Sequence, residues 1–325
     1  MSSVLETAVI NLTSPPVLAF ALGLLATVFK ANLRLPEPVY QAITIYLLLG
    51  IGIKGGVALS KASLAELIWP VFGALLLGLL IPILAFYVLR LLPKLSVVDR
   101  GALAAHYGST SLVTFTAALV FFESLSVPVE GFVTTLLAIL EIPGIIVGLL
   151  LAARSRRESV GMKDSLLEVV QGKSIVLLAG GLAIGAITGE AGFLRIEPFF
   201  GGLFTGVLTL FLLELGIVAG RRLPDLKVAG FGLIAFGIGF PVLSGSLGVL
   251  TGHLTQMGVG GAAVLGVLCA SASYIAAPAA VRLALPDASP GIYLTASLGI
   301  TFPFNLTLGI PLMYSVSLAL EGIGL

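Results

Sequence analysis

The chain has 325 residues, of which 58% are hydrophobic and only 10% are charged. This apolar content exceeds what one soluble core could bury, so the composition excludes a soluble globular domain and indicates a protein embedded in a lipid bilayer. The 17 basic and 16 acidic residues nearly cancel, which leaves no basic patch for a nucleic acid. We therefore expect an all-α polytopic membrane protein with no nucleic-acid partner.

Ten apolar stretches that could form membrane helices follow one another along the chain, separated by short polar segments. In chain order they predict transmembrane helices at residues 17–29, 39–53, 67–89, 102–122, 131–153, 174–188, 199–220, 228–250, 258–281 and 291–320. In this arrangement 14 of the 17 lysines and arginines fall on one side, and only Lys54, Lys61 and Arg195 fall on the other. Because basic loops stay cytoplasmic, we expect a multi-pass protein of the bacterial inner (plasma) membrane with both termini outside.

A polar interval at residues 154–173 divides the chain near its midpoint, and related features recur on its two sides at an offset of 160 residues. The fifth and tenth predicted helices share this spacing in two matching sets: Gly131, Thr135, Glu141 and Pro143, and Gly291, Thr295, Thr301 and Pro303. The pattern predicts a repeat of five helices at 1–153, a cytoplasmic linker at 154–173 and a second repeat at 174–325. Five helices per repeat place the second copy upside down in the membrane, an architecture that transporters use for alternating access.

Small polar residues cluster in the middle of the fourth and ninth predicted helices. The two clusters comprise Gly108, Ser109, Thr110 and Ser111 in the first, and Ser271, Ala272 and Ser273 in the second. Gly108 and Pro278 weaken the helical hydrogen bonding there, so we expect broken helices at the midplane. Broken helices offer N–H groups and hydroxyls to a small anion, and freed carbonyls to a cation such as Na⁺. The alternative is that these residues only allow close helix packing, but their recurrence in both halves favours a substrate site.

Ionisable side chains inside predicted membrane helices are candidates for function because hydrocarbon penalises them. Glu141 lies just before Pro143, and it is either a cation or proton site or a packed, protonated carboxyl. His106 lies beside the first polar cluster, where a proton carrier and a hydrogen-bonded core imidazole are both open. A structural role is favoured for Glu214, and snorkelling to the membrane surface is favoured for Lys54.

Motifs for catalysis are missing from the sequence. There is no HExxH, GxSxG or paired-cysteine pattern, and two histidines make a metal centre improbable. We therefore expect neither an enzyme nor a bound cofactor, and no metal beyond Na⁺ as a coupling ion.

Several motifs resemble the sodium-dependent bicarbonate transporter family of cyanobacteria and other bacteria. They are IGIKGGVAL from Ile51, YGSTS from Tyr107, EIP from Glu141 and, above all, SASYIAAP from Ser271. The resemblance implies ten helices in two inverted repeats, a core domain that moves against a gate domain, and a homotrimer. It also implies Na⁺-coupled uptake of bicarbonate, with the anion held between the two helix breaks.

The chain departs from that family's pattern at the motif in the ninth helix. Tyr274 stands where the family has an aspartate, and Ala276 and Ala277 replace a serine and a glycine. The residues considered for cation or proton coupling are therefore Glu141, Tyr274, His106 and Thr301. The linker is also shorter than in the cyanobacterial members, which gives a cytoplasmic regulator of the PII-like class less to bind.

Two functions are open at this stage. The leading hypothesis is a secondary transporter that takes up bicarbonate with Na⁺. The alternative is a proton-coupled or uncoupled permease for another small anion such as a carboxylate. A membrane sensor would need a soluble output domain, and inverted repeats with broken helices favour a carrier over a channel.

Overall fold

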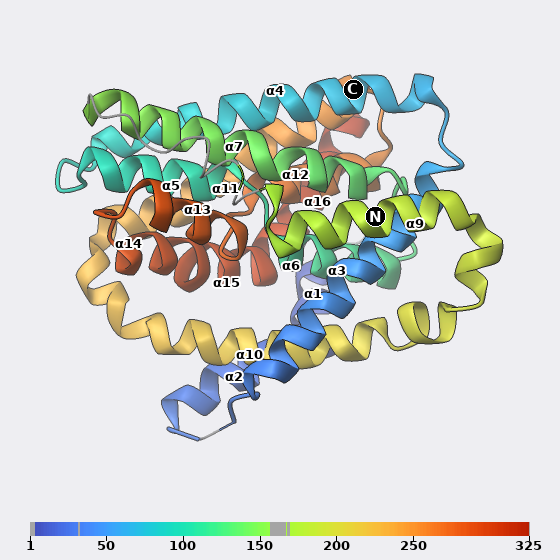
Figure 1. Cartoon of the computed structure of the whole chain (residues 1–325), viewed down its shortest axis with the longest axis horizontal. Coiled ribbons are helices and arrows are strands. Elements are labelled where there is room, and N and C mark those ends of the chain that lie inside the picture. Colours follow the sequence, from blue (N-terminus) through green and yellow to red (C-terminus); the bar gives the residue numbers. More distant parts are fainter. Residues whose placement is uncertain (1–3, 32, 157–166, 168–169, 325) are drawn as a thin grey trace.

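A computed structural model describes residues 4–31, 33–156, 167 and 170–324, and within these ranges every regular element is a helix (Figure 1). Most of the predicted linker at 154–173 lies outside the described residues. The α-helices in chain order are α1 (Val4–Leu12), α2 (Pro15–Val28), α3 (Glu37–Leu59), α4 (Leu64–Val88), α5 (Val97–Gly108), α6 (Leu112–Ser124), α7 (Val133–Arg156), α9 (Lys173–Leu194), α10 (Phe204–Arg222), α11 (Leu226–Leu254), α12 (Val259–Ala270), α13 (Ala276–Ala284), α14 (Pro290–Leu294), α15 (Phe302–Phe304) and α16 (Ile310–Gly322).

Seven helical segments of the described chain are long and apolar enough to cross a membrane. They are Glu37–Leu59, Leu64–Leu91, Val133–Ala153, Lys173–Leu194, Phe204–Arg222, Gly230–Leu254 and Pro290–Gly322. The protein is therefore a helical, polytopic membrane protein, as its composition predicts. The other three predicted spans differ in form: residues 17–29 fall in the short helix α2, while 102–122 and 258–281 are each divided by a non-helical break.

The last segment, Pro290–Gly322, departs from regular α-helical geometry along much of its length. Two π-helical stretches, Thr295–Thr301 and Asn305–Gly309, flank the single turn α15. Proline has no backbone N–H, so Pro303 and Pro311 each remove a donor from the helical ladder and favour such wider turns. The predicted helix at 291–320 is thus one continuous helical segment with irregular hydrogen bonding.

Glycines allow two long helix pairs to pack with their backbones nearly touching. In the α3–α9 pair, a Cβ atom on Gly56 would lie 2.1 Å from the Leu182 carbonyl oxygen. In the α2–α10 pair, a Cβ on Gly216 would lie 2.1 Å from the Phe20 carbonyl oxygen. Close approach of this kind drives helix association in membranes, where burial of apolar surface does not.

Three glycines of α9 that are spaced four residues apart have two different roles. Gly181 and Gly185 contact α3 directly, since a Cβ on either would lie within 3 Å of α3 backbone atoms. Gly189 makes no such contact, and its φ of +59° bends the helix near its end. Only a glycine adopts this left-handed conformation at low cost. The first two of these glycines therefore serve helix packing, and the third serves the bend.

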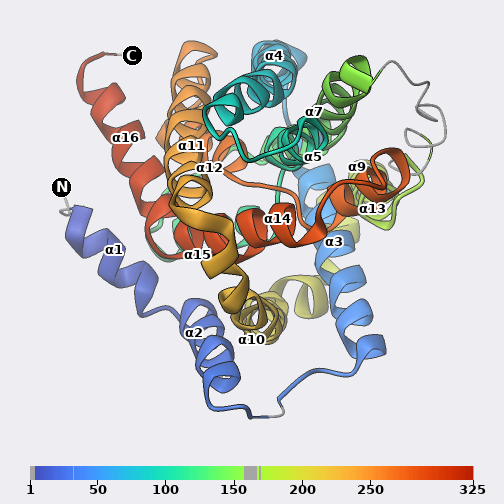
Figure 2. The ribbon, with the colours of Figure 1, turned by 90° about the vertical axis from the view of Figure 1, so that its left-hand side faces the viewer.

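The helices form two groups. In the first, α2 packs on α10 and α3 packs on α9; in the second, α4, α5 and α7 pack on one another, as do α11, α12 and α16. Figure 2 shows α2, α3 and α10 on one side of the molecule and the second group on the other. The N-terminal helix α1 lies against α16, so the first and last helices are neighbours.

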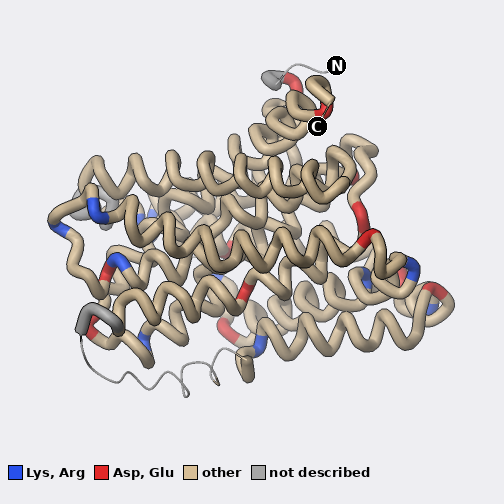
Figure 3. Tube along the Cα trace, turned by 90° about the horizontal axis from the view of Figure 1, so that it is seen from above, with Lys and Arg blue, Asp and Glu red and all other residues tan. Residues whose placement is uncertain are grey.

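Two carboxylates link loops of one half of the chain to helices of the other. Glu130, which precedes α7, accepts a hydrogen bond of 2.6 Å from the Gly258 N–H at the start of α12. Asp99 in α5 accepts one of 2.8 Å from the Ser289 N–H, just before α14. Charged residues otherwise gather toward the ends of the long helices, with few between them (Figure 3).

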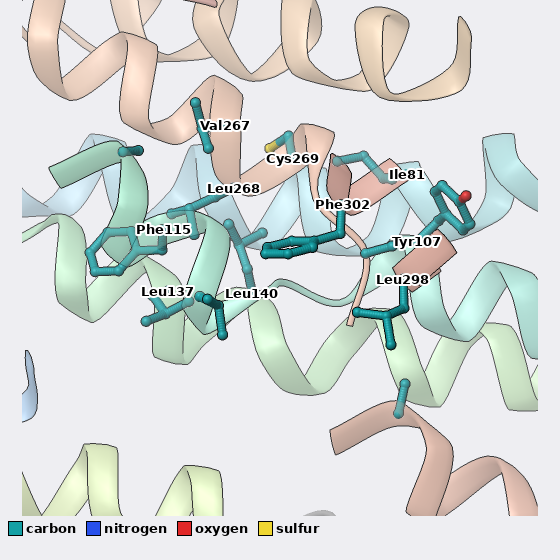
Figure 4. Close-up of a cluster of buried hydrophobic side chains, with 14 of the residues drawn as sticks. Ile81, Tyr107, Phe115, Leu137, Leu140, Val267, Leu268, Cys269, Leu298 and Phe302 are labelled. Carbon is teal, nitrogen blue, oxygen red and sulfur yellow. The ribbon is translucent and has the colours of Figure 1, made fainter. Parts of the chain in front are cut away.

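An apolar cluster surrounds the broken helices. It draws side chains from α4, α5, α6, α7, α12 and α15, with Phe302 near its centre (Figure 4). The residues labelled there are Ile81, Tyr107, Phe115, Leu137, Leu140, Val267, Leu268, Cys269, Leu298 and Phe302. Such close packing holds the non-helical segments in place, because they lack the hydrogen bonds of a continuous helix.

Candidate functional site

The first break separates α5 from α6 at residues 109–111. α5 ends at Gly108, and α6 begins after Ser111, whose Oγ accepts hydrogen bonds from the Thr114 N–H (3.2 Å) and the Thr114 hydroxyl (3.0 Å). A serine that precedes a helix in this way satisfies one of the N–H groups that the first turn leaves without a partner. The polar cluster predicted in the fourth helix is therefore a true interruption that starts a new helix.

The second break is longer and separates α12 from α13 at residues 271–275. α12 ends at Ala270, and α13 begins at Ala276 without a side-chain cap from Ile275. Ser273 Oγ accepts a hydrogen bond of 3.1 Å from the Ala277 N–H. Pro278 lies in the first turn of α13, where its missing N–H costs nothing.

Hydrogen bonds join the two breaks directly. The Ser111 N–H donates to Ser271 Oγ (2.8 Å), and the Ser273 N–H donates to the carbonyl of His106 (2.8 Å). Asn305, in the last membrane segment, donates from Nδ2 to the Ala270 carbonyl at 2.7 Å. The two breaks therefore lie side by side, and each supplies partners for backbone groups that the other leaves open.

A small polar pocket, with a cavity volume of about 10 Å³, lies beside the joined breaks. Its lining comes from four elements and comprises Thr110, Ser111 and Leu112, Ser273 to Ala276, Glu141 of α7 and Ser174 of α9. The larger apolar crevice of about 430 Å³ between α2 and α11 contains no residue of either break. The chemistry therefore points to the smaller pocket.

Five of the residues predicted from sequence meet in this pocket: Thr110, Ser111, Ser273, Tyr274 and Glu141. The side chain of Glu141 is the most unusual of them. It is only 7% exposed, and within the described residues it forms no hydrogen bond or ion pair. An unpaired carboxyl in such surroundings is costly, so it marks a place where a cation, a proton or a ligand group is expected.

Other predicted residues lie beside the pocket lining and not in it. Gly108 packs on α7, where its carbonyl oxygen would lie 1.8 Å from a Cβ added to Gly144. Ser109 is buried, and its hydroxyl has no partner within the described residues. The Ser271 hydroxyl accepts a hydrogen bond from the Ser111 N–H and donates one to the Leu268 carbonyl (2.7 Å). These residues, with the buried Ala272, shape the breaks.

His106 and Thr301 are both fully buried and both hold helices together. His106 Nδ1 lies 2.7 Å from the Ala102 carbonyl oxygen, and its ring packs on Tyr293 at 4.5 Å between centroids. Thr301 donates to the Gly237 carbonyl (2.7 Å), and its hydroxyl oxygen lies 2.6 Å from the hydroxyl of Tyr107. These contacts place the two residues away from the pocket lining.

The two remaining ionisable candidates belong to the α2–α3–α9–α10 group. Glu214, 4% exposed, accepts a hydrogen bond of 2.8 Å from the Leu35 N–H, and its other oxygen lies 4.0 Å from Arg34 Nε. Glu214 therefore fixes the loop between α2 and α3, as a structural role requires. Lys54 lies over the ring of Phe204, 4.5 Å from its centroid, which is a cation–π contact.

Three residues of the site escaped the sequence analysis. Ser174 is predicted only as the first residue of the sixth helix, although it lines the pocket. Asn305 and Gly144 lie in the tenth and fifth predicted helices, where they contact the ends of α12 and α5. An asparagine inside an apolar helix is a signal that could have identified the first of these contacts, since its amide must find a partner.

The electrostatics of the pocket combine positive helix ends with one carboxyl. α6 and α13 begin at its lining, and the N-terminus of a helix carries a partial positive charge. The hydroxyl-bearing residues Thr110, Ser111 and Ser273 line the same pocket as Glu141. Oxygen donors are what a hard cation such as Na⁺ prefers, so the residues present fit both a small anion and Na⁺.

Comparison with known proteins identifies the family of the chain. A model of the Na⁺-dependent bicarbonate transporter superfamily matches residues 15–318, which confirms the resemblance seen in the motifs. No curated protein matches the chain. Because the family model covers nearly the whole sequence, the chain belongs to the Na⁺-dependent bicarbonate transporter superfamily.

Proposed function

We propose that this protein is a secondary transporter that takes up bicarbonate together with Na⁺ by alternating access. One observation carries the proposal: both helix breaks meet at a pocket that also contains Glu141, a buried carboxyl with no partner within the described residues. Membership of the superfamily supports bicarbonate as the substrate.

The anion would bind at the starts of α6 and α13. These helix ends direct backbone N–H groups and a partial positive charge toward the pocket, where a small oxyanion is stabilised without a basic side chain. The Ser111 and Ser273 hydroxyls add donors that can follow the geometry of the anion. Hydrogen bonds to a charged ligand are among the stronger ones in proteins.

Glu141 couples the anion to a cation. An ionised carboxylate in the pocket repels a bound anion, and the low polarity of the surroundings makes this repulsion strong. A Na⁺ ion bound to Glu141 removes the repulsion and attracts the anion. By linkage the anion then strengthens Na⁺ binding by the same factor, so the two solutes move together.

The helix packing supports alternating access between two inverted repeats. α2 pairs with α10 and α3 pairs with α9, so each pair joins one helix from each half of the chain. The proposed gate domain is the group α2, α3, α9 and α10, and the proposed core domain is α4 to α7 with α11 to α16. We further propose ten membrane crossings, both termini outside, a homotrimer, and a linker at 154–173 that a PII-like regulator could contact.

The test is counterflow of labelled bicarbonate in proteoliposomes, with and without a Na⁺ gradient and at two pH values. We expect native uptake to rise with Na⁺, and Glu141→Gln to lose this dependence because a neutral amide gives Na⁺ no charge to bind. Glu214→Gln is the matched control, because this carboxyl is also buried. It accepts a hydrogen bond from the Leu35 N–H, and the side-chain oxygen of a glutamine can accept the same bond. This variant should keep its Na⁺ dependence.

Three results would change the proposal. Na⁺ dependence that survives in Glu141→Gln would place the cation elsewhere. A dependence on pH in place of Na⁺, lost in Glu141→Gln, would establish proton coupling through the same carboxyl. Absence of bicarbonate exchange, with exchange of a small carboxylate, would establish the alternative permease.

A further inference from the structure

The N-terminus of α9 lies at the pocket and not at an end of the helix bundle. Figure 1 shows that α9 begins midway along the neighbouring α7, although the polar linker precedes it in the sequence. Ser174, in its first turn, is the one lining residue that does not come from the proposed core domain. The gate domain therefore reaches the pocket through the start of α9.

This helix end has free hydrogen-bonding capacity. Ser174 is 8% exposed, and within the described residues its hydroxyl forms no hydrogen bond. The residue that precedes the helix, Gly172, has no side chain to cap the first turn, so the leading N–H groups of α9 lack the partner that Ser111 gives to α6. A buried hydroxyl and uncapped N–H groups at a pocket call for an acceptor from outside the chain.

We propose that the first turn of α9 is the gate-side wall of the anion site and that the Ser174 hydroxyl binds the transported anion directly. This inference rests on the proposed transport function and assigns it a residue. The N-termini of α6, α13 and α9 then all lie at the same pocket. Such an arrangement selects a small oxyanion with acceptor oxygens on several sides, over a halide or a long carboxylate.

The first half of the chain supplies a matched control. Ser14 lies 160 residues before Ser174; it immediately precedes α2, whereas Ser174 is the second residue of α9. The Ser14 N–H donates to the Asn11 carbonyl at 3.1 Å, since α1 continues the chain upstream, and Ser14 does not line the pocket. A change at Ser14 therefore alters a serine at the start of a helix without altering the proposed site.

The first experiment compares transport kinetics. We expect Ser174→Ala to raise the apparent KM for bicarbonate about tenfold, the usual scale for one lost hydrogen bond to a charged ligand. Ser174→Thr keeps the hydroxyl and should stay closer to the native value, while Ser14→Ala should match it. A KM in Ser174→Ala equal to that in Ser14→Ala would overturn the inference.

The second experiment does not depend on transport rates. In a Cys269→Ala background, which removes the chain's one cysteine, Ser174→Cys and Ser14→Cys are treated with a small charged thiol reagent. We expect bicarbonate to slow labelling at position 174 and to leave labelling at position 14 unchanged. Equal rates at position 174 with and without bicarbonate would contradict direct contact.

The two proposals fail in distinguishable ways. If native protein exchanges bicarbonate and Ser111→Ala weakens it, but neither Ser174 experiment gives the expected result, the pocket binds the anion from the core alone. If native protein exchanges no bicarbonate, the proposed function fails first. If another small oxyanion then slowed labelling at position 174, the first turn of α9 would still be the gate-side wall of the site, and that oxyanion would replace bicarbonate as the substrate.

Discussion

The first break spans residues 109–111 and the second spans 271–275, and the two hold their helix ends by different means. The first presses Gly108 against Gly144 of α7, with no room for a side chain between them. The second binds the Ala270 carbonyl with the amide of Asn305. The first contact is steric and the second is polar, although each joins a break to the last helix of its own half of the chain.

The two breaks should therefore respond differently to amino-acid substitution. A steric contact between glycines depends on the absence of atoms, so the smallest addition disturbs it. A side-chain hydrogen bond depends on one donor, so its removal leaves a buried acceptor without a partner. Each break caps the helix that follows it, since Ser111 accepts a hydrogen bond from the Thr114 N–H and Ser273 accepts one from the Ala277 N–H. The two breaks therefore differ in how they hold the preceding helix end and not in how they cap the next helix.

The largest effect is expected from Gly144→Ala. The new methyl group would lie 1.8 Å from the Gly108 carbonyl oxygen, and neither backbone can yield without separating α5 from α7. We expect a loss of about 3 kcal/mol or more of stability and no transport. Thermal unfolding in detergent measures this. Gly206→Ala in α10, where a Cβ would meet nothing within 4 Å, is the control and should be near native.

Asn305→Leu tests the polar contact of the second break. The substitution keeps the branched shape of the side chain and removes the donor to the Ala270 carbonyl, which should cost about 1–3 kcal/mol of stability. Ser246→Ala should be near neutral, because that hydroxyl bonds only the Val242 carbonyl of its own helix. Equal unfolding temperatures for Asn305→Leu and Ser246→Ala would show that the amide is dispensable.

Sequence patterns predicted much of the fold because hydropathy and helix breakers act locally. The seven long apolar segments, and the breaks near Gly108 and Ser271, follow from composition and from Ser, Gly and Pro in apolar runs. The wide turns of Thr295–Thr301 and the bend at Gly189 did not follow, because a proline or a glycine in an apolar run permits a deviation from the α-helix without specifying which one.

The site was predictable only in part, for a geometric reason. Sequence identifies which residues are polar, but not which part of a break borders the pocket. The unbroken runs 110–112 and 273–276 line it, so Ser111 and Ser273 are included while Ser109 and Ser271 are not. Ser174 escaped prediction because it follows the polar linker, and nothing local indicates that α9 starts beside the breaks.

Alanine substitutions at the four serines of the breaks test which of these residues line the pocket. We expect Ser111→Ala and Ser273→Ala to weaken bicarbonate affinity about tenfold, because each removes a hydroxyl that lines the pocket. Ser109→Ala should leave affinity unchanged, while Ser271→Ala should lower stability, since it strips the acceptor from the buried Ser111 N–H. The measurements are counterflow and thermal unfolding. Equal affinity losses in all four variants would mean that the breaks act as one unit.

The smallest effect is expected at Tyr274, where this chain departs from the aspartate of the family pattern. Tyr274 lines the pocket with Glu141, and its ring packs edge-on against Phe302 at 5.4 Å between centroids. Tyr274→Asp adds a second carboxylate beside Glu141, and two nearby carboxylates favour a bound cation. An added interaction of about 1 kcal/mol would raise the ratio of uptake with and without Na⁺ about fivefold.

Tyr274→Phe is the control, because it removes the hydroxyl and keeps the ring contact with Phe302 without adding charge. Its ratio of uptake with and without Na⁺ should equal the native one. If Tyr274→Asp and Tyr274→Phe gave the same ratio, a carboxylate at this position would not reach the cation. The Na⁺ ligands would then be Glu141, hydroxyls and backbone carbonyls alone, and the lost aspartate would have no part in coupling in this chain.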